Sequence, residues 1–163
     1  MELGEMVNII RQHHALEHAT VTLLLKRLEG NVRLVGRAGL TGFYLYGDVP
    51  TEAVEEAARE ALRRLQEGEE ELAISPLCGT NIVVAGIMAG IASMIAAKGR
   101  DGLRKLDRVL TASILAVLFS QPLGRLVQKY LTTKSDLSDV SIVRVVRMGE
   151  GGRTRHKVEV EHL

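Results

Sequence analysis

An uninterrupted apolar stretch limits the possible folds of this chain more than any other feature of its sequence. From Ile82 to Ala97 every residue is apolar or small, so a helix over this stretch has no polar face for water. Sixteen helical residues rise about 24 Å, which is less than the roughly 30 Å of a hydrocarbon core. Val109–Leu123 forms a second apolar segment. Basic residues fill the connection between the two: Lys98, Arg100, Arg104, Lys105 and Arg108. The pair predicts a helical hairpin that either crosses a membrane, with its basic loop on the cytoplasmic side, or is buried in a protein core or oligomer.

Small residues within the first apolar segment indicate a partner helix. Gly86 and Gly90 form a G-x-x-x-G pair, a spacing that lets a second helix approach closely, most often inside a membrane. The sequence lacks tryptophan, which is common at the ends of membrane helices, but the pure apolarity of the segment favours a membrane. We therefore expect membrane lipid as a partner, the inner (cytoplasmic) membrane as the location, and a homo-oligomer formed through Gly86 and Gly90.

Composition argues against one class of partner. The chain of 163 residues has a net charge of only +1, and its aromatic residues are three tyrosines and two phenylalanines. Nucleic-acid binding proteins commonly have a basic stripe interleaved with aromatic residues. This sequence has no such stripe and only five aromatic residues, so no nucleic-acid partner is expected. A single cysteine excludes an intrachain disulfide.

The residues best suited to metal binding or catalysis lie near the N-terminus. His14, Glu17 and His18 spell H-x-x-E-H, the order that inverted zincin metallohydrolases use. Helical i, i+4 spacing stacks His14 over His18, so both imidazoles can reach one ion, and Glu17 flanks the same point. The same helical stripe holds six apolar residues: Leu3, Val7, Ile10, Val21, Leu25 and Leu28. The stripe predicts that the motif points inward, where a bound cation would compensate for its polar groups.

A simpler interpretation of the motif stays open. Histidines on a helix can merely hydrogen-bond to their neighbours, and a five-residue pattern also occurs by chance. Two histidines and a carboxylate on one face favour a metal site, because these groups together supply ligands. His13 points elsewhere and is interpreted as a surface residue or a residue that supports the ligands.

A second candidate lies between Ser75 and Asn81. Cys78 comes just before the first apolar helix, for which Thr80 or Asn81 is the expected cap. The positive end of a helix dipole lowers the pKa of a cysteine and favours the thiolate, which binds zinc or attacks carbonyls. Gly79 would let the backbone approach whatever Cys78 contacts. The alternative is a small buried thiol packed at a turn.

The remaining segments predict an α+β fold. It begins with an N-terminal motif helix and a small sheet with one crossover helix. The apolar hairpin, interpreted as transmembrane, and a C-terminal β-hairpin follow. The motif helix should cover residues 2–29 and end at Gly30. Residues 31–48 read as a hairpin with a loose or bulged turn. Thr51 is expected to cap a second helix that ends at Gly68. Glu71–Ser75 is expected to be a short strand.

After Leu131 the sequence turns polar, and two strands are expected at Val140–Met148 and Thr154–His162. His156 and His162 share a face of the last strand. Either could be a further metal ligand, and the alternative is that they are surface histidines. We expect three parts: residues 1–78 with the motif helix, residues 79–131 as the apolar hairpin, and residues 132–163 as a β-hairpin packed on the first part.

The combined motifs resemble a known group. His14-x-x-Glu17-His18 and Cys78-Gly79-Thr80-Asn81 together are similar to a family of uncharacterised small bacterial membrane proteins, and the chain looks like a shorter relative of the YqhQ-like predicted metal-dependent membrane proteins. The similarity runs from Arg11 to Thr133 and includes residues 42–47 (GFYLYG) and 121–124 (QPLG). It implies a membrane location and a metal site, without an established substrate. Members of that group often have a histidine shortly before the C-G-T, where this chain has Ser75-Pro76-Leu77, so Cys78 becomes the better candidate to complete the ligand set.

The favoured function is a zinc-dependent hydrolase at or within a membrane, such as a peptidase. His14, His18 and Cys78 would bind zinc, water would take the fourth position, and Glu17 would act as general base on a peptide or other carbonyl substrate. One alternative is a noncatalytic membrane protein with a structural metal site or helix-mediated self-association. Another is an enzyme whose nucleophile is Cys78, with His14 or His18 as base.

Overall fold

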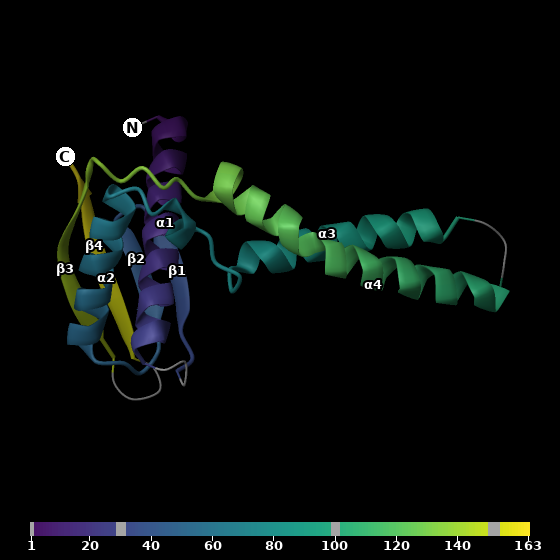
Figure 1. Cartoon of the computed structure of the whole chain (residues 1–163), viewed down its shortest axis with the longest axis horizontal. Helices are drawn as coiled ribbons and strands as arrows, with labels where there is room; N and C mark the ends of the chain where they lie inside the picture. Colours follow the sequence, from purple (N-terminus) through teal and green to yellow (C-terminus); the bar gives the residue numbers. More distant parts are fainter. Residues whose placement is uncertain (1, 29–31, 99–101, 150–153) are drawn as a thin grey trace. The chain divides into compact units, whose positions relative to one another are not determined.

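The structure is a computed structural model that describes residues 2–28, 32–98, 102–149 and 154–163 (Figure 1). Its elements in chain order are α1 (Leu3–Arg27), β1 (Val35–Gly39), β2 (Gly42–Tyr46), α2 (Thr51–Gln66), the 3₁₀ turn η1 (Glu70–Ala73), α3 (Gly79–Ala96), α4 (Gly102–Val127), the π turn η2 (Gln128–Thr132), β3 (Val140–Met148) and β4 (Arg155–His162). They form two compact units, of which unit 1 comprises residues 1–75 and 129–163 and unit 2 comprises residues 76–128. The expected end of the first helix at Gly30 falls outside the described residues.

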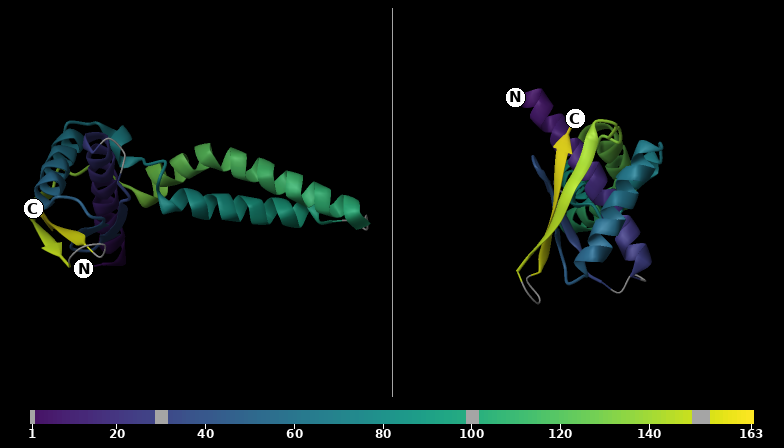
Figure 2. Two further views of the ribbon diagram at one scale, coloured as in Figure 1. Left: turned by 90° about the horizontal axis from the view of Figure 1, so that it is seen from below. Right: turned by 90° about the vertical axis from the view of Figure 1, so that its left-hand side faces the viewer.

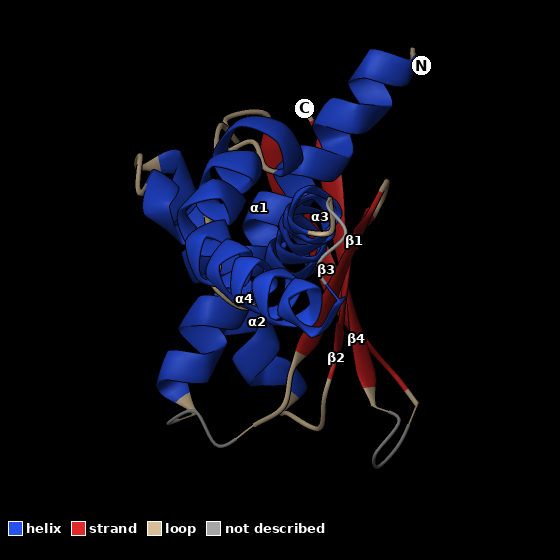
Figure 3. Cartoon of the chain, turned by 90° about the vertical axis from the view of Figure 1, so that its right-hand side faces the viewer, coloured by secondary structure: helices blue, strands red, loops and turns tan. Residues whose placement is uncertain are grey.

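Unit 1 is a two-layer arrangement of helices on a sheet. Its four antiparallel strands follow the order β1-β2-β4-β3, and α1 and α2 lie side by side on one face (Figures 2 and 3). Alternate residues of the strands point into this layer, and Phe43, Leu45 and Val158 are fully buried. The α+β fold expected from the sequence, with its C-terminal β-hairpin, is confirmed.

The β1–β2 hairpin is tighter than the glycine-rich sequence indicated. Gly39 pairs with Gly42, so only two residues connect the strands, and the expected loose or bulged turn is wrong. Gly42 has φ of +115°, and a Cβ atom there would overlap the carbonyl oxygen of Val158 in the neighbouring strand β4. The glycine is therefore required by close backbone packing as well as by its conformation.

The expected strand over Glu71–Ser75 is also wrong, because Glu70–Ala73 forms the 3₁₀ turn η1. A run of five residues, three of them apolar, does not distinguish a strand from a helical turn. The expected end of α2 is confirmed, since Gly68 follows the helix with φ of +94°. Thr51 as the cap is wrong, because the N-cap residue is Pro50 and Thr51 is the first residue of the helix.

The apolar stripe expected along α1 is buried over only part of its length. Leu3, Val7 and Ile10 are exposed, whereas the residues from Ala15 to Leu24 supply most of the buried side chains of the helix. Figure 2 shows the reason: the N-terminal turns of α1 extend beyond the sheet. The part of α1 that lies against the sheet begins near the histidine motif.

Unit 2 is an antiparallel pair of helices, α3 and α4, with apolar surfaces. Eighteen residues of α3 rise about 27 Å. Among the described residues, two helical stretches are long and apolar enough to cross a membrane, Gly79–Ala96 and Arg104–Thr132. Only 11% of an apolar 18-residue window in each stretch is buried. The hydroxyl oxygens of Ser93 and Ser113 lie 2.7 Å apart and join the two helices.

Polar side chains also join the helices of unit 2 near its chain ends. The amide of Gln128 donates to Asn81 Oδ1 at 2.9 Å, and Asn81 Nδ2 donates to the carbonyl of Pro76 at 3.0 Å. A Cβ atom at Gly124 would overlap Asn81 Oδ1. The glycine of the QPLG segment therefore leaves room for a buried asparagine.

Candidate metal centre

Helix α1 brings the two motif histidines together. His14 and His18 lie one helical turn apart, and their ring centroids are 4.3 Å apart with the planes at 60°. His18 is buried and His14 is partly exposed. The stacking expected from their spacing is confirmed.

Backbone carbonyls orient both imidazoles. His14 Nδ1 donates to the carbonyl of Thr132 at 2.9 Å, and His18 Nδ1 donates to the carbonyl of Ala73 at 2.7 Å. Because a carbonyl oxygen only accepts, the proton of each neutral ring is on Nδ1 and the lone pair is on Nε2. Metal-binding histidines commonly have this arrangement, in which an outer acceptor fixes the tautomer and orientation of the ring. The two imidazoles thus fit the chemistry of a zinc ligand pair.

Glu17 lies beside the pair. Its Oε2 atom is 3.9 Å from His14 Nε2, and the residue is only 7% exposed. The carboxylate rests against Gly36 in strand β1, where a Cβ atom would overlap it. Gly36 thus provides the space that Glu17 occupies.

Cys78 belongs to the other unit. It is the N-cap residue of α3, and its Sγ atom accepts a hydrogen bond from the Thr80 backbone N–H at 3.4 Å. The expectation that Thr80 or Asn81 caps this helix is therefore wrong. The thiol is buried and forms no disulfide. Its role as the third ligand stays a prediction.

The remaining histidines are more buried than expected. His13 is fully buried, so it is not a surface residue, and burial lowers its pKa. His156 is also fully buried, and its Nε2 atom lies 3.2 Å from the hydroxyl of Thr51. Burial and then the positive charge of Arg147 lower the pKa of His156. His162 is partly exposed and contacts His13.

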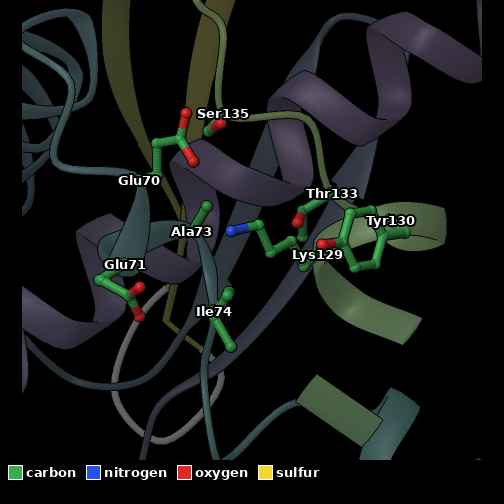
Figure 4. Close-up of a pocket in the computed structure, with 8 residues that line it drawn as sticks. All are labelled: Glu70, Glu71, Ala73, Ile74, Lys129, Tyr130, Thr133 and Ser135. Atoms are coloured by element: carbon green, nitrogen blue, oxygen red, sulfur yellow. The ribbon is translucent and has the colours of Figure 1, made fainter. Parts of the chain in front are cut away.

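A small pocket borders the two backbone segments that hold the histidines. It encloses about 90 Å³, and Figure 4 shows its lining residues: Glu70, Glu71, Ala73, Ile74, Lys129, Tyr130, Thr133 and Ser135. Ala73 also provides the carbonyl that orients His18, and Thr133 follows the residue that orients His14. The amine of Lys129 points into this space. The pocket thus adjoins the backbone segments that orient the histidines, although neither His14 nor His18 is among the residues that line it.

Together these features define an α+β protein with a candidate metal centre and a pair of apolar helices. Residues 9–145 match a domain family described as a domain of unknown function, DUF6391, and the chain belongs to this family. It is similar to an uncharacterised protein of the cyanobacterium Picosynechococcus sp. strain PCC 7002, with 37% identity over 79% of this chain and 68% of the relative. No solved structure matches the chain. Membership of an uncharacterised family is thus confirmed, whereas the resemblance to YqhQ-like proteins stays a hypothesis.

Proposed function

We propose that this protein is a zinc-dependent, membrane-associated hydrolase of a carbonyl substrate such as a peptide. The observation that supports this most is the pair of Nδ1 hydrogen bonds from His14 and His18 to carbonyl oxygens. These bonds leave both Nε2 lone pairs with the orientation and tautomer that a metal ligand needs.

In the proposed reaction, His14, His18 and Cys78 would hold zinc, and the fourth position would be left for water. Bound zinc supplies Lewis acidity that makes water a better nucleophile and polarises a carbonyl group. Glu17, next to His14, takes the proton from the attacking water and passes it to the leaving group. Lys129 in the adjacent pocket binds a negatively charged part of the substrate.

The location proposed for this activity is the bacterial inner (cytoplasmic) membrane. The exposed apolar side chains of α3 and α4 support contact with lipid, since water would be an unfavourable surrounding for so many of them. The cyanobacterial relative supports a bacterial origin.

The test separates metal binding from catalysis. Glu17→Gln should retain the zinc content of the wild type but lose at least about 100-fold in hydrolysis of a peptide library, because a general base contributes roughly 10²–10⁴-fold. His14→Ala should lose the zinc ion of the candidate metal centre together with the activity. Equal hydrolysis by wild type and Glu17→Gln would overturn the catalytic proposal and favour a structural metal site.

The same assay tests an enzyme that uses Cys78 as its nucleophile. A thiol alkylator would then abolish hydrolysis while a chelator would not, since no metal takes part in that chemistry. The zinc proposal expects the chelator to abolish hydrolysis.

A noncatalytic role in self-association is the second candidate. A Cβ atom added at Gly86 or Gly90 would meet no atom of the described residues within 4 Å, so the α3–α4 pairing leaves this face of α3 open. A second copy of the chain could approach there. Substitution of both glycines by isoleucine should then convert a dimer in detergent to a monomer, whereas an unchanged oligomeric state would exclude this face.

A further inference from the structure

A second pair of histidines lies in unit 1, on different elements from the first. His13 extends from α1 and His162 from the end of β4, and their Nε2 atoms are 3.1 Å apart. The ring centroids are 5.1 Å apart, with the planes tilted by 43°. The two residues are 149 positions apart in the sequence, so only the fold brings them together.

The Nδ1 atom of each ring, which lies away from the other histidine, faces an oxygen acceptor. His13 Nδ1 lies 2.6 Å from the carbonyl oxygen of Gly39 and 3.2 Å from the backbone nitrogen of Gly42. The shorter contact decides whether Nδ1 is a donor or an acceptor. A carbonyl oxygen can approach this closely only if Nδ1 carries the proton, so Nδ1 is the donor. His162 Nδ1 lies 3.2 Å from Asp139 Oδ2.

Asp139 is an ionised acceptor. Burial raises the pKa of its carboxyl group, but hydrogen bonds from His162 and Gln12 outweigh this effect, so the pKa lies below its ordinary value. Gln12 Nε2 donates to the other carboxylate oxygen at 2.7 Å. His162 Nδ1 is therefore also a donor.

If both rings are neutral, each Nε2 atom carries a lone pair, and two such atoms 3.1 Å apart repel each other unless they share a cation. Two imidazoles bound to one tetrahedral zinc at 2.0–2.1 Å place their nitrogens about 3.3 Å apart, close to the separation here. The carbonyl and the carboxylate behind the rings are the acceptors usually found behind zinc-binding histidines. The side chain of His162 is 23% exposed, so water can reach the site and complete the shell.

We propose that His13 and His162 form a second, open binding site for a divalent transition metal such as zinc, oriented by Gly39 and Asp139. The competing occupant of the same gap is a single proton shared between the rings. This inference does not depend on the hydrolase proposal, because it uses none of the residues His14, Glu17, His18 and Cys78.

The experiment titrates the full chain with zinc alone. Protein without a histidine tag is stripped with a chelator in detergent, and binding is followed by equilibrium dialysis. Wild type should bind two zinc ions per chain. His162→Ala should weaken one of them at least 10-fold, and Asp139→Asn should weaken the same one by about 10-fold or more, because outer partners typically contribute 10- to 100-fold.

His162 is the first choice for substitution because it is partly exposed, whereas loss of the buried His13 could disturb folding. His156→Asn is the matched control, since His156 lies on the same face of β4 but bonds to Thr51. Zinc binding by folded His162→Ala within twofold of the wild type would overturn the proposal and assign the gap to a shared proton. His14→Ala should keep the His162-dependent ion, so failure of the first site and failure of the second give different results.

Discussion

The two units of this chain place their apolar residues in opposite ways. Unit 1 buries its large apolar side chains between a sheet and two helices, whereas unit 2 exposes them along both helices. The two phenylalanines of the chain illustrate the contrast, because Phe43 of β2 is 0% exposed and Phe119 of α4 is 67% exposed. The first pattern is that of a domain stabilised by its own core, and the second is that of a surface made for lipid or another helix.

The largest expected effect is a difference between the two phenylalanines. Phe43→Ala should lower the free energy of unfolding by about 3–5 kcal/mol, because it leaves a cavity in a filled core. Phe119→Ala should change it by less than about 1 kcal/mol, since most of that ring has no protein neighbour to lose. Denaturant titration in a mild detergent measures both. Equal losses would contradict the contrast between the units.

A charge placed on each unit tests what surrounds unit 2. Ile87 of α3 is 57% exposed and Val143 of β3 is 49% exposed. Ile87→Lys should cost about 2.5–3.5 kcal/mol if α3 lies in lipid, and it should reduce the fraction of protein that stays in carbonate-washed membranes. Val143→Lys is the control and should leave that fraction unchanged. Equal membrane fractions for both variants would argue against a lipid environment for α3.

Substitutions of two glycines by alanine compare the packing at the metal centre with the packing in unit 2. Gly36→Ala should destabilise unit 1 by about 1–3 kcal/mol, because the added methyl group overlaps the carboxylate of Glu17. Gly86→Ala meets open space and should be tolerated. Thermal unfolding of both variants provides the measurement. In a Glu17→Ala background the loss from Gly36→Ala should largely disappear, and an undiminished loss would show that Glu17 is not the group displaced.

The smallest expected effect concerns pH. All five histidines belong to unit 1, so stability near neutral pH should depend on that unit. The pKa of His156 is lowered in the folded state, so below its unfolded value of about 6.5 the unfolded chain takes up the proton more readily. Its neutral form therefore contributes stability above that pH, and the contribution falls on acidification toward the folded pKa. Denaturant titrations at pH 7.5 and 5.5 should show a smaller loss on acidification for His156→Asn than for wild type, and an identical loss would rule out this role.

The sequence predicted those parts of the molecule that follow from periodicity. The spacing of His14 and His18, the limits of β3 and the apolar hairpin required only local patterns, and the structure has all three. The metal site, which both the spacing of the motif and the resemblance predicted, stays a prediction. Local patterns also failed where a segment was short, as at η1.

Other features depend on residues distant in the chain. The backbone carbonyls of Ala73 and Thr132 accept hydrogen bonds from His18 and His14. Every residue has a backbone carbonyl, so the sequence could not predict which ones orient the histidines. His162 reaches His13 only because β4 lies between β2 and β3 in the sheet. Leu3 and Ile10 matched the helical period but are exposed, because the N-terminal turns of α1 extend beyond the sheet that would cover them.

The central claim is that His14 and His18 of α1 hold a metal ion, and elemental analysis of the purified protein tests it most directly. Untagged wild type, dialysed to remove weakly held metal, should retain close to one zinc per chain at the candidate metal centre, apart from any ion at His13 and His162. His14→Ala and His18→Ala should each lose most of the zinc at the candidate metal centre. Less than about a tenth of an equivalent of zinc in the wild type, with no further change on His14→Ala, would contradict the metal centre and the hydrolase proposed from it.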